Sequence, residues 1–172
     1  MRSVASRLKS NITKITLPNK DEETLQVLLE DINNALERGK PELVLDRLHT
    51  FSTKLIRHAC ESNGIKVTND KGDYLPLHSL AGMLKKEYEK DSLFQSTFTM
   101  FAIQNSISLF DKYNAIRNNQ SYAHDNTILD SMEAEFAIRT MANLITFLDK
   151  VEIYRKATYK NTLNSSDSFK YK

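Results

Sequence analysis

The sequence predicts an all-α protein, an antiparallel bundle of about five to six helices. At 172 residues the chain has the length of one domain with a sizeable core. It contains only 4 Gly and 3 Pro, which disfavours a turn-rich sandwich or barrel and favours long helices. Apolar residues recur at helical spacing along most of the chain. We therefore expect one helical domain over residues 1–157 and a flexible, disordered tail over residues 158–172.

Two helices before residue 64 are predicted from their start and stop signals. The acidic residues 21–23 suit a helix N-terminus, and Gly39 suits the end of that helix. Pro41 can open the second helix, because its missing N–H is not needed in the first turn, and Asn63-Gly64 ends it. The predicted inward stripes are Leu25, Leu28, Leu29, Ile32 and Leu36 in the first helix, and Val44, Leu48, Phe51, Leu55 and Ala59 in the second.

After residue 64 the chain is predicted to contain a surface loop and three helices, and a further short helix is predicted before residue 16. A polar loop over residues 65–76 leads to a helix over residues 77–89, with Leu80, Met83, Leu84 and Tyr88 inward. Residues 94–116 have apolar side chains on more than one face and should therefore form the central helix. The spacing of Phe94, Phe98 and Phe101 in this run predicts that they are core residues. The last helix follows His124, with Thr127 or Asp125 as its cap, and its stripe is Ala134, Ile138, Met141, Ile145, Leu148 and Val151. A thin stripe in residues 3–15 predicts a further short helix at the start of the chain.

The balance of charge limits how this protein can bind nucleic acid. The net charge is only +2, so the whole protein creates no field that would hold RNA tightly. Any RNA binding must come from a local basic patch. Candidates for this patch are Arg47, Lys54, Arg57, Lys85 and Lys86, although each is more often ordinary solvated helix surface.

Cysteine, histidine and hydropathy patterns exclude other classes. The single cysteine, Cys60, cannot form an internal disulfide and should be a buried small hydrophobe. The histidines form no HExxH or comparable pair, so we predict no metal site and no cofactor. A signal peptide and an apolar run of about 18 residues are both missing from the sequence, so we expect a cytoplasmic protein without a membrane span.

The stretch DKYNAIRNNQSYAHDN, residues 111–126, contains the candidate site. Arg117 and His124 are separated by six polar or small residues, which favour a helix end over a helix interior. We expect a helix ending near Arg117, a short connection, and His124 just before the next helix. Long helices joined this briefly lie antiparallel, which places both side chains at one end of the bundle. The alternative is structural, because most Arg and His residues at helix ends only cap carbonyl groups.

The residues of this stretch resemble the signature of the HEPN superfamily. That signature is an Arg with a polar neighbour followed, after four to six residues, by a His; here RN at 117–118 precedes SYAH at 121–124. Within the superfamily the chain looks most like the C-terminal domain of abortive-infection proteins. Residues 37–57 and 133–148 resemble the earlier helical pair and the closing helix of that domain, and the resemblance covers roughly residues 21–153. One departure is Asp125, where family members often have glycine.

The resemblance implies a metal-independent endoribonuclease of an anti-phage abortive-infection or toxin type. His124 would act as general base or acid, and Arg117 would bind the phosphate. The supporting or substrate-binding positions would be Asn118, Asn119, Ser121, Tyr122 and Asp125. The expected partners are RNA (tRNA or mRNA), a second copy in a homodimer, and an antitoxin or partner domain. The alternative is a non-catalytic HEPN-like module that dimerises or binds RNA or nucleotide, which Asp125 keeps open.

Overall fold

The structure is a computed structural model that describes residues 15–18, 20–94, 96–119 and 131–167. These residues form five helices: α1 (Glu23–Glu37), α2 (Pro41–Ser62), α3 (Leu77–Lys90), α4 (Thr97–Asn119) and α5 (Ser131–Asp167). Within these ranges the only β pairing is one isolated bridge, between Thr68 and Tyr74 in the loop before α3. The predicted all-α helical bundle is confirmed. The helix predicted over residues 3–15 falls almost entirely outside the described residues.

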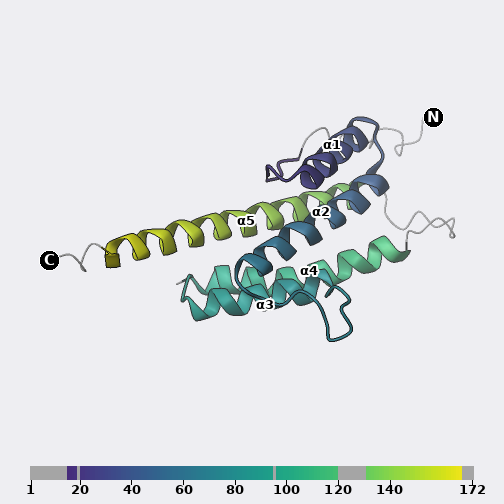
Figure 1. Ribbon diagram of the computed structural model, residues 1–172. Helices are drawn as coiled ribbons and strands as arrows, with labels where there is room; N and C mark the ends of the chain where they lie inside the picture. The colour runs from purple at the N-terminus through teal and green to yellow at the C-terminus, as the bar shows by residue number, and fades with distance from the viewer. Residues whose placement is uncertain (1–14, 19, 95, 120–130, 168–172) are drawn as a thin grey trace, which may run out of the picture.

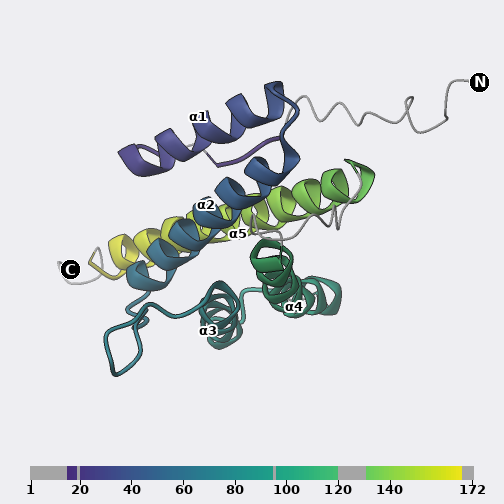
Figure 2. The same ribbon diagram turned by 90° about the vertical axis from the view of Figure 1, so that its right-hand side faces the viewer.

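The helices form two layers. In Figure 1, α1, α2 and α5 lie above α3 and α4, and Figure 2 shows α3 and α4 nearly end-on while the other three helices run across the view. α2 is the central element, since it packs against α1, α3 and α5 and, over a shorter stretch, α4. The prediction that residues 94–116 form the central helix is therefore wrong. α4 packs mainly on α3 and lies at the edge of the bundle.

The boundaries of α1 and α2 follow from a few residues. The Glu22 carboxylate accepts a hydrogen bond from the backbone N–H of Leu25 (3.2 Å) and thereby caps α1. Gly39 has φ +61°, a conformation that L side chains rarely adopt, and this glycine turns the chain into α2. Pro41 occupies the first turn of α2, as predicted, and Gly64 (φ +70°) follows its end. Both helix predictions are confirmed.

One core cluster draws side chains from all five helices. The predicted stripes of α1, α2 and α5 are buried in it, except that Leu29 and Ala59 lie at its margin and Ala134 is buried outside it. The buried side of α4 differs from the prediction. Ile103, Ser106 and Phe110 are buried, whereas Phe98 and Phe101, predicted as core residues, are 79% and 67% exposed. Met83 on α3, which was also predicted inward, is exposed.

The ends of α4 and α5 also differ from the prediction. α4 begins at Thr97, and Phe94 lies before it with its ring packed near those of Tyr88 (6.0 Å between centroids) and Phe147 (6.2 Å). α5 continues to Asp167, so the helix extends beyond residue 157, where a tail was expected to begin. Across the described part of the chain, no helix combines the length and the apolar character that crossing a membrane requires.

Candidate functional site

The predicted Arg–His motif begins in the last turn of α4. Arg117, Asn118 and Asn119 complete that helix, which therefore continues slightly past the predicted end at Arg117. The C-terminal end of α4 and the N-terminal end of α5 lie toward the same end of the bundle, on the right of Figure 1. The motif thus belongs to the connection between an edge helix and the longest helix of the fold.

The remaining motif positions fall in residues 120–130, outside the described part of the chain. They are Ser121, Tyr122, His124 and Asp125. The side chains of Arg117, Asn118 and Asn119 also lie outside the description. The pairing of Arg117 with His124, and the roles of all seven positions, therefore stay predictions.

The imidazole of His78 lies beside the part of α4 that leads to the motif. His78 Nδ1, in the first turn of α3, is 3.4 Å from Asp111 Oδ1 on α4, and both side chains are partly exposed. Asp111 precedes Asn118 by about two helical turns, or about 10 Å along the axis. His78 therefore lies about two turns of α4 from the motif. In the sequence, His78 is one of the histidines that form no metal-binding pair, and no sequence signal pairs it with Asp111.

A buried polar cluster that was not predicted from the sequence lies at the other end of the bundle. Arg155 on α5 is only 4% exposed; its guanidinium donates to the Asp91 carboxylate, with Nε 2.8 Å from Oδ2, and to the Asn63 side chain. Glu152, 6% exposed, accepts a hydrogen bond from Asn63 Nδ2 (2.8 Å) and lies 3.5 Å from Arg155 Nη1. These contacts join the C-terminal ends of α2 and α3 to α5. The signal that could have found them is spacing, since Glu152 and Arg155 continue the buried stripe of α5 after Leu148.

Burial and the carboxylates near this cluster raise the pKa values of two neighbouring groups, the Cys60 thiol and the Tyr88 hydroxyl. Burial, and then the nearby carboxylates of Glu152 and Glu61, raise the pKa of the Cys60 thiol to about 12. Burial and the Glu152 carboxylate likewise hold the pKa of the Tyr88 hydroxyl well above its usual range. Both groups stay protonated at neutral pH, and Cys60 is buried as predicted, so neither is an activated nucleophile. We assign the cluster to structure.

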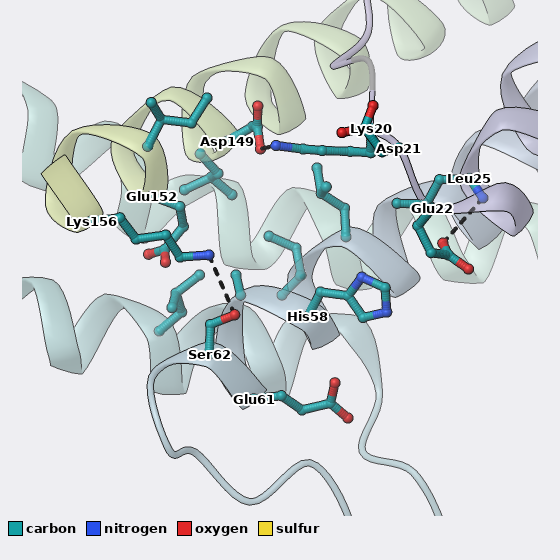
Figure 3. A pocket seen from close by; sticks show the side chains of 16 residues that line it. Lys20, Asp21, Glu22, Leu25, His58, Glu61, Ser62, Asp149, Glu152 and Lys156 are labelled. Carbon is teal, nitrogen blue, oxygen red and sulfur yellow. Dashed lines mark hydrogen bonds and ion pairs between the residues drawn. The ribbon is translucent and has the colours of Figure 1, made fainter.

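A pocket of about 400 Å³ lies between the chain before α1, the C-terminal half of α2, and α5 (Figure 3). Its walls carry five carboxylates against two lysines, of which Lys20 pairs with Asp149 (2.5 Å) and Lys156 donates to Ser62 (3.4 Å). A pocket with this excess of carboxylates repels a phosphate. The part of α5 that lines it lies about 27 Å along the helix from Ser131, far from the motif. The pocket and the predicted RNA site are therefore different places.

Most residues predicted to line an RNA groove have partners within the chain. Arg47 lies 3.3 Å from Asp31, Lys54 donates to Thr24 (2.8 Å), and Lys85 lies 2.7 Å from Glu89. The Arg57 guanidinium stacks on the Tyr74 ring, 3.6 Å from its centroid. The charges of Arg47 and Lys85 are thus partly compensated by carboxylates, Lys54 is hydrogen-bonded to a hydroxyl, and the Arg57 guanidinium is stacked on a ring. Among the described residues, nothing on α1–α3 replaces the motif as a candidate for phosphate chemistry.

The fold and the motif position together define a HEPN-like helical bundle with an Arg-Asn…His sequence at the α4–α5 connection. The sequence model of the Abi_C HEPN-like domain family matches residues 23–152. The chain belongs to this family, as the resemblance predicted. The match runs from the start of α1 into α5 and includes the whole motif. Searches of curated proteins and of solved structures gave no match.

Proposed function

We propose that the protein is a metal-independent endoribonuclease of the abortive-infection or toxin type. The observation that carries the proposal is the family match, which spans Arg117 and His124. The HEPN superfamily includes ribonucleases. The position of the motif also supports the proposal, because Arg117 and Asn118 lie in the last turn of α4, directly before the α4–α5 connection. A functional residue placed on a connection supported by rigid helices is a common arrangement.

The proposed chemistry uses the nucleophile of the substrate. His124 takes the proton from the ribose 2′-OH, the 2′-oxygen attacks the adjacent phosphorus, and the bond to the 5′-oxygen breaks. The products are a 2′,3′-cyclic phosphate and a 5′-hydroxyl, the latter formed when a second group returns a proton to the leaving oxygen. Arg117 donates two hydrogen bonds to the phosphate oxygens as negative charge develops on them. Asn118 holds the phosphate or orients Arg117.

The proposal requires a second proton-transfer group. The motif contains one histidine, whereas removing a proton from the 2′-OH and delivering one to the 5′-oxygen are two tasks. A homodimer that brings two motifs together supplies the second group, because a two-fold axis repeats the same patch. We therefore propose a composite site that two copies of the α4–α5 connection share, with tRNA or mRNA as substrate.

The test compares motif variants with variants of matched surface residues. Arg117→Ala and His124→Ala should each slow cleavage of purified total RNA by about a hundredfold or more, with an unchanged circular dichroism spectrum. The controls are Arg139→Ala, an exposed arginine on α5, and His58→Ala, an exposed histidine on α2, and both should cleave at the wild-type rate. Wild-type cleavage by both motif variants would refute the proposal.

The second candidate is a HEPN-like module that binds RNA or nucleotide without cleaving it. The departure at Asp125 favours it, because a carboxylate beside the predicted His124 repels a phosphate. The variant Asp125→Gly separates the two. If wild-type protein retains RNA without cleaving it, and Asp125→Gly cleaves, the natural chain is the binding module.

A further inference from the structure

The pocket between the chain before α1, α2 and α5 has an apolar floor and a charged mouth. Its floor is formed by buried side chains, those of Leu55, Ile56, Leu84 and Leu148. Exposed carboxylates lie on two sides of the mouth in Figure 3, Asp21 before α1 on one side and Glu61 in the last turn of α2 on the other. Its volume of about 400 Å³ lies within the range of small-molecule sites, which is about 300–1,000 Å³.

The charges around the pocket leave two carboxylates uncompensated. Three of the five carboxylates have a basic side chain within 4.0 Å, those of Glu22, Asp149 and Glu152. Across the described ranges of the chain, Asp21 and Glu61 have no such partner. Lys156 lies in the same wall, but its ammonium donates to the Ser62 hydroxyl (3.4 Å). A cationic ligand would therefore compensate charges that the protein itself does not.

The pocket already contains one alkylammonium group, which belongs to the protein. Lys20 Nζ lies 2.5 Å from Asp149 Oδ1, and Figure 3 shows the Lys20 side chain extended along the pocket wall to reach that carboxylate. The two side chains are 29% and 12% exposed, so salt screens this pair less than a fully exposed one. A lysine packs its methylene stem on apolar surface and directs its charged end to a polar partner. The same walls can receive a second stem of this kind.

A buried acceptor in the pocket wall also lacks a hydrogen bond. Glu152 is 6% exposed, and within the described residues its Oε1 has no hydrogen-bond partner. The Arg155 Nη1 atom lies 3.5 Å from Oε1, while Oε2 accepts a hydrogen bond from Asn63. Buried acceptors are usually satisfied, and an unsatisfied one costs free energy. A ligand N–H group at this wall would supply the missing donor.

We propose that this pocket binds a small aliphatic diamine or polyamine. The methylene chain of the ligand packs on the apolar floor, and its ammonium groups bind the carboxylates of Asp21 and Glu61 at the mouth and that of Glu152 in the wall. A metal ion fits less well, because the described residues contain no group of three or more His, Cys, Asp or Glu side chains that could hold one. The site is separate from the predicted RNA site, about 27 Å away along α5.

The first test is titration calorimetry of the whole chain with spermidine at low salt and without RNA. The wild type should show one saturable site, and Asp21→Asn/Glu61→Gln should lower the affinity about tenfold. The control Glu30→Gln/Glu37→Gln removes the same two charges from exposed positions of α1 and should keep the wild-type affinity. A wild type without saturable binding, or equal weakening in both double variants, would overturn the proposal. Because no RNA is present, the result is independent of the proposed cleavage.

The second test places a competing ammonium in the mouth of the pocket. Ile153 lines the pocket and is 56% exposed, whereas its neighbour Tyr154 is 62% exposed and does not line it. Ile153→Lys should lower the spermidine affinity by about tenfold or more, while Tyr154→Lys, with the same change in charge, should alter it by about twofold or less. Circular dichroism should be unchanged, since both side chains lie on the surface. Equal affinities of the two variants would place the ligand outside the pocket and overturn the site.

The source of the ammonium group is tested with two further probes. A free diamine, 1,4-diaminobutane, can reach two carboxylates, whereas Nα-acetyl-lysine amide offers one ammonium on a similar stem and represents a lysine side chain of a partner protein. The diamine should bind more tightly. Tighter binding of the lysine derivative would overturn the polyamine as ligand and identify the pocket as a receptor for a lysine side chain.

Discussion

Two phenylalanines on one helix, Phe110 and Phe101, should respond very differently to replacement by alanine. Phe110 is fully buried in the core, whereas Phe101 is 67% exposed. Truncating a buried phenylalanine removes about 150 Å² of apolar contact beyond Cβ, or about 4 kcal/mol at roughly 25 cal/mol per Å². This agrees with the range of about 3–5 kcal/mol for core Phe→Ala changes. Phe101 has only a third of its surface covered, so its truncation should cost about 1 kcal/mol or less.

Urea unfolding followed by circular dichroism measures both losses. The free energies should be compared at equal m-values, so that a change in midpoint reports stability alone. The unfolding curves should be recorded at two protein concentrations, because any self-association would add a concentration-dependent contribution to stability. Equal losses for the two variants, or a larger loss for Phe101→Ala, would mean that α4 presents the opposite face to the core.

Three further predictions test the buried cluster and the residues near the motif. Arg155→Ala should destabilise the fold by about 3–5 kcal/mol, because it leaves the Asp91 and Glu152 carboxylates without their buried cation. In the same unfolding assay, the control Arg139→Ala, at an exposed residue, should change stability by about 0.5 kcal/mol or less. The Cys60 pKa is raised from 9.0 to about 12, so the folded state keeps a proton that the unfolded state loses, and stability should fall as pH rises between these values. Cys60→Ala should show a shallower fall, and a thiol reagent should label native Cys60 only after unfolding; immediate labelling would contradict its burial. Finally, His78→Asn should raise KM for RNA severalfold with kcat nearly unchanged, since His78 lies about two turns of α4 from the motif, whereas His58→Asn should change neither constant.

The helix boundaries could be predicted where a backbone requirement selects the residue. Gly39 supplies a left-handed conformation, and Pro41 opens α2 at a position that does not need its N–H. The stripes of α1, α2 and α5 were equally clear, because their other faces are polar and the period of 3.6 residues therefore points to one buried side.

The face of α4 could not be predicted by the same rule. Apolar residues surround this helix, so periodicity does not tell which side meets the core. The structure buries Ser106 and exposes Phe101, because α4 packs mainly on α3 and this contact, which the sequence does not specify, selects the buried side. Arg155 was missed for a related reason, since a charged residue is assigned to the surface unless its partners are known. Its partners Asn63 and Asp91 cap the C-terminal ends of α2 and α3 and are far away in the sequence.

The candidate site was recognised from residue identities and not from periodicity. The Arg-Asn…His spacing led to the HEPN family, which the match over residues 23–152 confirms. Spacing also predicted that Arg117 lies near a helix end, and α4 ends at Asn119. The approach of His124 to Arg117 depends on residues 120–130, which no periodic pattern specifies.

The chemistry of the RNA ends tests the central claim most directly. Purified protein is incubated with RNA in the presence of EDTA, and the new 3′ ends are mapped and assigned to phosphate type. The proposed mechanism predicts 2′,3′-cyclic phosphates opposite 5′-hydroxyls with the wild type. It also predicts a rate lower by about two decades with Arg117→Ala, the loss expected when about 3 kcal/mol of phosphate stabilisation is removed. Cleavage that stops with EDTA and returns with magnesium, or that leaves 3′-hydroxyl ends, would contradict it.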